Sequence, residues 1–246
     1  MKQQAESWKD QMIDEIDSPD FNWLDFQPIE AKEGMMIHYT PRWPLMLHYI
    51  CAMICFGMSA VYHLFNSHSH EMMRFWIRFD YAGICFMIAG STTPPVYYSF
   101  GCDELQDWRW FYLGLIYAVN FITMVTMMIP YFDRDDMQSL RSIMFVSTAG
   151  FAVFPVCHIV YHVDPEFLPR FYLEPWLLGA AMYVTGAIFY AFKYPECCSK
   201  QGTFDIYGSS HQIMHIMIVS AALTHYYGAI QVFHDRQLYS CPLKHV

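Results

Sequence analysis

The sequence predicts an all-α protein that crosses a membrane several times as a helix bundle. The 246 residues are 55% hydrophobic and 18% aromatic, and only 15% are charged, whereas a soluble domain carries about 25% charged residues. Long stretches nearly free of Asp, Glu, Lys and Arg recur along the chain, each with the ~20 residues that a helix needs to cross hydrocarbon. The alternative, a soluble helical bundle, should show polar faces at helical period, and these stretches are apolar all round.

Six such stretches predict six transmembrane helices within one domain, residues 43–233, at about 43–66, 79–100, 110–130, 142–163, 171–192 and 206–233. The second contains Asp80 as its only charged residue, the fifth contains only Glu174, and the others contain none. Their connections are short, so sequential helices should be antiparallel neighbours. Prolines inside the second and fourth spans, at Pro94, Pro95 and Pro155, can kink those helices.

The two ends of the chain are expected to lie outside the bilayer. Residues 1–42 form an acidic segment that carries much of the net charge of −9, and residues 234–246 form a C-terminal tail. The acidic charge argues against nucleic-acid binding, which requires a basic surface. The first residues are charged and lack the apolar core of a cleavable signal peptide.

Lysine and arginine in the loops predict the orientation. Alternate loops hold six of these residues against two in the opposite loops, which are Arg109 and Arg170. Because cytoplasmic loops are enriched in positive charge, the richer set should face the cytoplasm and residues 1–42 the outer side. The richer set comprises Arg74, Arg78, Arg134, Arg141, Lys193 and Lys200.

The candidate metal ligands begin with a pair of histidines in the last span. His211 and His215 are four residues apart, so both imidazoles lie on one helical face, one turn apart. Ionisable groups within membrane spans are rare and usually functional. Two stacked imidazoles in an apolar helix therefore indicate half of a metal site.

The topology supplies candidates for the other half. His63 near the end of the first span and Asp80 near the start of the second should lie at the same cytoplasmic depth as His211 and His215. Three histidines with one open position form a typical catalytic zinc site. Asp80 could bind the metal, hold a metal-bound water, or orient a histidine. Ser59 lies one turn before His63, and we take Asp80 and Ser59 as candidate catalytic residues.

Other polar residues in the spans have simpler explanations. His48, His158 and His162 are interpreted as core residues or as helix-to-helix hydrogen bonds. His225 is ten residues beyond His215, about 15 Å along a helix, so the two cannot share an ion. An alternative for Asp80 is a simple ion pair with Arg78 at the interface, and this alternative competes with its role at a metal.

Five motifs carry a resemblance to a known family: SAVYHLFNSHS at Ser59, DYAGI at Asp80, PPVYYSF at Pro94, MYVTGAIFYAFKYPE at Met182 and FDIYGSSHQIMHIMIVSAALTHYYG at Phe204. In this order they resemble the progestin and adipoQ receptor family. The nearest likeness is to the adiponectin receptors, and a more distant one is to bacterial haemolysin III-type proteins.

This resemblance implies roles for the candidate residues. It implies that His63, His211 and His215 bind Zn²⁺ near the cytoplasmic face and that Asp80 holds a zinc-bound water. Ser59 matches the serine of the wider superfamily that includes the alkaline ceramidases. The family has seven spans and a cytoplasmic N-terminus, whereas residues 1–42 contain no stretch long enough to be the additional helix. Either the gene model is truncated or the chain is a six-helix variant.

Three functions remain open on the sequence. The first is an adiponectin receptor-like hydrolase in the plasma membrane or an endomembrane, which cleaves a lipid amide such as ceramide with zinc-activated water. The second is a receptor or membrane-state sensor with a structural zinc and an unidentified signalling partner. The third, a transporter or channel, is weakest, because internal repeats and broken helices are not visible.

Cysteines and glycines add smaller expectations. Cys102 and Cys241 both fall on the predicted outer side and could form a disulfide. Cys197 and Cys198 are adjacent in a loop, which hints at lipidation. Gly179 and Gly186 recur one heptad apart and should permit a close helix contact.

Overall fold

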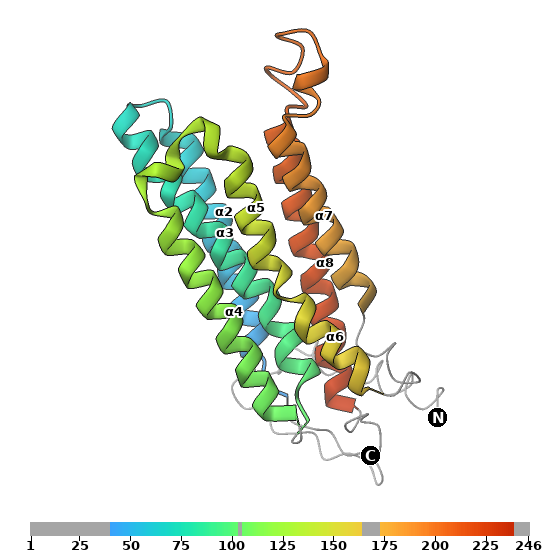
Figure 1. Cartoon of the computed structure of the whole chain (residues 1–246). Coiled ribbons are helices and arrows are strands. Elements are labelled where there is room, and N and C mark those ends of the chain that lie inside the picture. The colour runs from blue at the N-terminus through green and yellow to red at the C-terminus, as the bar shows by residue number, and fades with distance from the viewer. Residues whose placement is uncertain (1–39, 103–104, 164–172, 239–246) are drawn as a thin grey trace, which may run out of the picture. The chain divides into compact units, whose positions relative to one another are not determined.

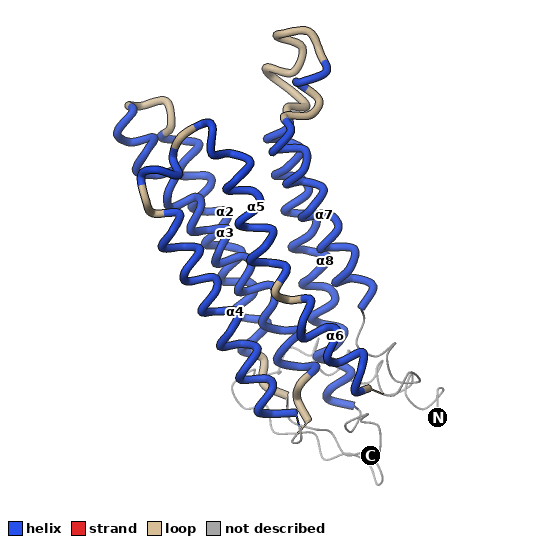
Figure 2. The backbone as a smooth tube through the Cα atoms, viewed as in Figure 1, coloured by secondary structure: helices blue, strands red, loops and turns tan. Residues whose placement is uncertain are grey.

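The computed structural model describes residues 40–102, 105–163 and 173–238, which form a bundle of α-helices with no β-strand among them (Figure 1, Figure 2). This confirms the predicted all-α class. The longer helices are α2 (Trp43–Phe65), α3 (His70–Ser99), α4 (Gln106–Met127), α5 (Gln138–Gly150), α6 (Val153–His162), α7 (Leu173–Phe192) and α8 (Ser210–Leu238). Short 3₁₀ turns are η2 (Pro130–Asp133), η3 (Asp135–Met137) and η5 (Glu196–Cys198). Most of the predicted acidic N-terminal segment and C-terminal tail lies outside the described residues.

Five helical stretches are long and apolar enough to cross a membrane: α2, α4, Gln138–His162, α7 and most of α8. Many of their apolar side chains are exposed, including Phe121 at 61% and Leu177 at 64%. Such exposure would be costly in water and is expected against lipid. Helix α3, which carries Asp80, is the other long helix of the described residues, and it packs along both α2 and α4.

Close approaches between α2 and α3 depend on small residues. A Cβ atom on Gly90 would collide with the Cβ of Cys51, and one on Gly83 would lie 3.0 Å from the Cα of Cys55. Membrane helices gain attraction mainly from tight van der Waals packing, because lipid gives no hydrophobic drive between them. These glycines therefore allow α2 and α3 to run side by side.

Helices α7 and α8 form a second close pair, as Gly179 and Gly186 predicted. A Cβ on Gly179 would collide with the His225 ring, and a Cβ on Gly186 would lie 3.1 Å from the Cβ of Met217. The predicted contact is confirmed. It also explains how α8, which carries His211 and His215, is held along its length.

Helix α3 is longer than the apolar stretch from which the second span was predicted. It begins at His70, where the Ser69 hydroxyl accepts a hydrogen bond from the Met72 backbone N–H at 3.2 Å. An acidic residue in the first turn, Glu71, also favours this helix start. About two and a half further turns of helix, which include Glu71, Arg74 and Arg78, therefore precede the predicted span.

Prolines affect the two spans that contain them differently. The stretch predicted at 142–163 is divided into α5 and α6 by a turn at Phe151–Ala152. Pro155 lacks the N–H that would bond the Phe151 carbonyl, so the turn precedes it. Pro94 and Pro95 instead lie within α3 and do not end it.

Helix α8 begins at Ser210, four residues after the start of the uncharged stretch. Gly208 has φ +77°, a left-handed conformation that does not continue a helix. The side-chain oxygen of Gln212 accepts a hydrogen bond from the Gly208 N–H at 2.7 Å. This cap places His211 and His215 in the first two turns of α8.

Candidate metal centre

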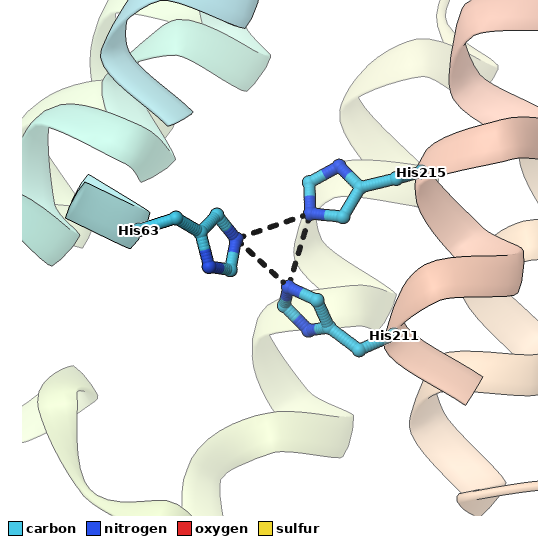
Figure 3. A group of neighbouring side chains, drawn as sticks. All are labelled: His63, His211 and His215. Atoms are coloured by element: carbon cyan, nitrogen blue, oxygen red, sulfur yellow. Dashed lines mark hydrogen bonds between the residues drawn. The ribbon is translucent and has the colours of Figure 1, made fainter. Parts of the chain in front are cut away.

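Three histidine side chains converge where α2 ends and α8 begins. His63 lies two residues before the end of α2, and His211 and His215 lie on one face of α8 (Figure 3). The Nε2 atoms are 3.2 Å apart between His63 and His211, 3.3 Å between His63 and His215, and 3.0 Å between His211 and His215. The structure therefore brings together the three predicted ligands, and within the described residues they form the one His, Cys, Asp or Glu group suited to a metal ion.

Hydrogen bonding alone does not account for this arrangement. A neutral imidazole nitrogen is either a donor or an acceptor. Among three mutually close Nε2 atoms, at least two must then have the same role, so at least one of the three contacts is unfavourable. A cation that accepts a lone pair from each nitrogen would remove this conflict.

The spacing also fits the ion that the resemblance implies. Nitrogens at about 2.0–2.1 Å from a tetrahedral zinc ion lie about 3.3–3.4 Å from one another. The observed separations of 3.0–3.3 Å are close to this value. Three imidazoles suit zinc as a donor set and occupy three of its four positions.

Aromatic rings support two of the histidines. The Tyr190 ring of α7 meets the His211 ring edge to face, with centroids 5.4 Å apart, and Tyr62 lies 5.1 Å from His63. His63 is exposed, whereas His211 and His215 are half-buried. The α8 pair is thus held by packing, while the α2 histidine is the more accessible member.

The two candidate catalytic residues lie next to this cluster. Asp80 is half-buried on α3 and is close enough to Ser59 and His63 to interact with both. Ser59 is buried one turn before His63, and its Oγ makes no hydrogen bond of ordinary geometry within the described part of the chain. We therefore describe Ser59 and Asp80 as neighbours rather than as a formed hydrogen bond.

The competing explanation for Asp80, an ion pair with Arg78, does not hold. Arg78 donates from Nε and Nη2 to the Asp133 carboxylate at 3.0 and 2.7 Å. This pair ties α3 to η2. Asp80 instead interacts electrostatically with His63, although it is not a member of the three-histidine group.

One residue beside the site was missed by the sequence analysis. Glu196 of η5 accepts hydrogen bonds from the Ser210 N–H at 2.8 Å and from the Ser210 hydroxyl at 2.9 Å. Burial raises the pKa of Glu196, but these bonds, its own backbone N–H and nearby Lys193 together hold the pKa below its usual value. The carboxylate caps α8 one residue before His211. No local motif links positions fourteen residues apart, so the sequence offered no signal for it.

His48, His158 and His225 make contacts within the helix bundle, whereas His162, predicted as a core or helix-to-helix residue, is exposed and, within the described residues, meets only the His158 and Tyr161 rings of its own helix. Tyr112 of α4 hydrogen-bonds His158 of α6 at 2.8 Å. His225 Nε2 lies 3.1 Å from the Trp176 carbonyl oxygen, and His48 packs edge to face against Tyr226. None of them belongs to the metal-suited group.

Cys102 is disulfide-bonded. Its expected partner, Cys241, lies outside the described residues, so the predicted pairing stays a prediction. The six other cysteines, Cys51, Cys55, Cys85, Cys157, Cys197 and Cys198, are free thiols.

The helices and their exposed apolar surfaces define a polytopic integral membrane protein. Residues 23–226 match the haemolysin-III-related family. The chain therefore belongs to this family, which includes the progestin and adipoQ receptors that the motifs resembled.

Curated relatives agree with this membership. Heptahelical transmembrane protein 1 of Arabidopsis thaliana is 34% identical over 218 residues, which cover 88% of this chain and 63% of that protein. Heptahelical transmembrane protein ADIPOR3 of Oryza sativa subsp. japonica is 34% identical over 84% of this chain and 50% of its own length. The adiponectin receptor protein of Drosophila melanogaster is 33% identical over 78% of this chain and 43% of its own length. The chain thus spans about half to two thirds of the length of these two plant relatives.

Proposed function

We propose that this adiponectin receptor-like membrane protein is a zinc-dependent hydrolase of lipid amides, with ceramide as the model substrate. The observation that carries the proposal is the convergence of the His63, His211 and His215 Nε2 atoms to within 3.3 Å beside the Asp80 carboxyl group. Three imidazoles would hold the ion and leave one position open, which is the pattern of catalytic rather than structural zinc.

The chemistry divides between the ion and two side chains. When bound, zinc supplies Lewis acidity, which makes water ionise near neutral pH and polarises a carbonyl group. In this proposal Asp80 takes the proton from the attacking water and returns it to the leaving amine, and its electrostatic interaction with His63 supports the role. The Ser59 hydroxyl, which lacks a well-formed hydrogen bond among the described residues, can donate to the developing oxyanion.

The surroundings of the cluster suit a substrate that is partly apolar. Leu64 and Ile216 directly follow His63 and His215 in sequence and are 72% and 65% exposed. Both lie on helices of membrane-spanning length. An acyl chain can therefore reach the site from the bilayer, while the exposed His63 keeps it open to water.

Asp80→Asn tests this proposal. In purified, zinc-loaded protein, the change should leave zinc content unaltered and reduce ceramide hydrolysis by about 10²–10⁴-fold, the usual contribution of a general base. Asp205→Asn, the same substitution at an exposed loop position, is the matched control and should retain activity. Full turnover by the Asp80→Asn protein would exclude the general-base role.

A second candidate is a receptor in which the zinc is structural and signals pass by conformational change. The name of the Drosophila relative, adiponectin receptor protein, favours it. If the protein is a hydrolase, the Asp80→Asn variant should lose product formation and keep its zinc. The receptor predicts that no lipid amide is consumed by either form.

A further inference from the structure

The loop between α7 and α8 exposes a pair of adjacent thiols that the metal site does not use. Cys197 and Cys198 lie in η5 with both side chains exposed, and their Sγ atoms are 3.2 Å apart. The thiols of Cys51, Cys55 and Cys85 are buried in the bundle. A reagent or enzyme at the membrane surface can reach Cys197 and Cys198 but not these three.

The pair lies close to the membrane end of α7. Turn η5 begins four residues after Phe192, the last residue of α7. Phe192 is 71% exposed and Tyr194 is 48% exposed, and Lys193 lies between them. Aromatic and lysine side chains at the end of a spanning helix are typical of the headgroup region. The two thiols are therefore within reach of the lipid interface.

Hydrogen bonds fix η5 relative to the helices. The Cys197 N–H donates to the Lys193 carbonyl at 2.8 Å, and Glu196 accepts from Ser210 at the start of α8. The loop extends beyond the ends of α7 and α8 (Figure 1), and these hydrogen bonds join η5 to the residue that follows α7 and to the first residue of α8. The thiols are thus presented by an anchored turn.

The side of the membrane suits enzymatic acylation. Positive side chains gather in the loops and adjoining first turns at this end of the helices, at Arg74, Arg78, Arg134, Arg141, Lys193 and Lys200. The positive-inside rule makes this the cytoplasmic end. Long-chain acyl-CoA thioesters, the donors of S-acyl groups, are cytoplasmic.

Redox sensing is a weaker explanation for the pair. Hydrogen bonding to Cys198 raises the pKa of the Cys197 thiol. Redox-sensor cysteines are instead thiolates of low pKa beside a positive group.

We propose that Cys197 and Cys198 are S-acylation sites that carry long-chain fatty acyl groups. The cysteine thiolate attacks the carbonyl carbon of a long-chain acyl-CoA, a sulfur–carbon bond forms, and the bond from that carbon to the CoA sulfur breaks. CoA leaves as a thiol with the proton that the cysteine lost, so no oxidant or reductant is needed. Acyl chains on adjacent cysteines supply two anchors, which hold a segment to a membrane much more firmly than one.

Acylation would also bear on the metal centre, because η5 caps α8 through Glu196. An acyl chain that holds η5 at the headgroups would steady the first turn of α8, where His211 lies. This inference does not rest on the proposed hydrolase activity. It concerns the loop itself and would stand if the protein were a receptor.

Acyl exchange with a mass tag tests the proposal on the full chain expressed in cultured eukaryotic cells. After free thiols are blocked, hydroxylamine releases thioester-bound acyl groups, and each released thiol takes one polymer tag. We expect species with up to two tags for the unsubstituted protein, up to one for Cys197→Ser and for Cys198→Ser, and none for the double variant. Because both side chains are exposed, serine should not disturb folding, which the yield in the membrane fraction checks.

Cys157→Ser is the matched control, since Cys157 is also an exposed, free thiol but lies within the membrane-spanning stretch Gln138–His162. It should leave the tag count unchanged. Unchanged tagging of the double variant, or no hydroxylamine-dependent tag on the unsubstituted chain, would overturn the proposal. Tagging that requires a reducing agent instead of hydroxylamine would show a disulfide and would overturn it as well.

Discussion

Helices α2 and α8 carry histidines in two regions, and the two sets behave differently. At one end, His63, His211 and His215 direct three Nε2 atoms at one another within 3.3 Å. Further along the same helices, His48 packs on Tyr226 and His225 meets a backbone carbonyl. Both sets are histidines in apolar helices. Residue type and burial alone do not distinguish the two sets. The difference is that the nitrogen lone pairs converge in the first set and do not converge in the second.

The largest expected effect breaks the metal-suited set directly. Alanine at His211 or His215 removes one of three ligands, so purified protein should lose essentially all zinc. His225→Gln, on the same helix outside the set, should keep it. Elemental analysis of both proteins measures the contrast. Equal zinc content in His215→Ala and His225→Gln would remove the distinction between the two regions.

His48 and His225, the second set, lie in tightly packed surroundings, so an added atom there should lower the stability of the fold and leave zinc binding unchanged. Gly179→Ala adds a Cβ that collides with the His225 ring, and overpacking of this kind costs about 1–3 kcal/mol. Thermal unfolding in detergent should show the lower stability while zinc per folded chain is unchanged. Gly150→Ala, where the added Cβ meets nothing within 4 Å, is the control. A loss of zinc without a loss of stability would contradict this assignment.

The Glu196 cap allows a subtler change at the metal end. Glu196→Ala removes both hydrogen bonds to Ser210, and loss of support of this kind typically weakens metal binding about 10-fold or more. Competition with a calibrated zinc chelator measures the affinity. Glu196→Gln retains an acceptor oxygen and should therefore bind zinc more tightly than Glu196→Ala. If the Glu196→Ala and Glu196→Gln variants both bind zinc as tightly as the unsubstituted protein, the cap does not position His211.

The smallest expected effect comes from the Arg78–Asp133 pair. Its side chains are 29% and 9% exposed, so solvent screens the pair in part, and Asp133→Asn should cost about 1 kcal/mol. Zinc content should not change, because Asp133 is outside the three-histidine group. Denaturation and metal analysis of one preparation check both expectations. Loss of zinc in this variant would show that the α3–η2 link controls the site.

The sequence predicted the all-α membrane class and the His211–His215 pair from strong local signals, and it added His63 from the order and direction of the spans. Uncharged stretches of spanning length identify helices, and a four-residue spacing aligns His211 with His215. Helix ends were predicted less well. Hydropathy does not detect charged helical extensions. The extension of α3 that begins after Ser69 is an example, and it adds about two and a half turns before the predicted span.

Contacts made by the loops and by residues at their edges were not predicted. The Arg78–Asp133 pair and the Glu196–Ser210 cap join positions whose proximity depends on how the loops fold back onto the helices. The turn between α5 and α6 was predicted only in part. Pro155 signalled a disturbance, but the sequence did not show that it would end a helix while Pro94 and Pro95 would not.

The most direct test of the account is X-ray absorption spectroscopy at the zinc edge on purified, unsubstituted protein, combined with elemental analysis. We expect one zinc per chain with imidazole nitrogens in its coordination shell, numbering about three, at about 2.0–2.1 Å. A protein that folds without bound metal, or a zinc signal dominated by sulfur ligands, would contradict the assignment of His63, His211 and His215 as the metal site.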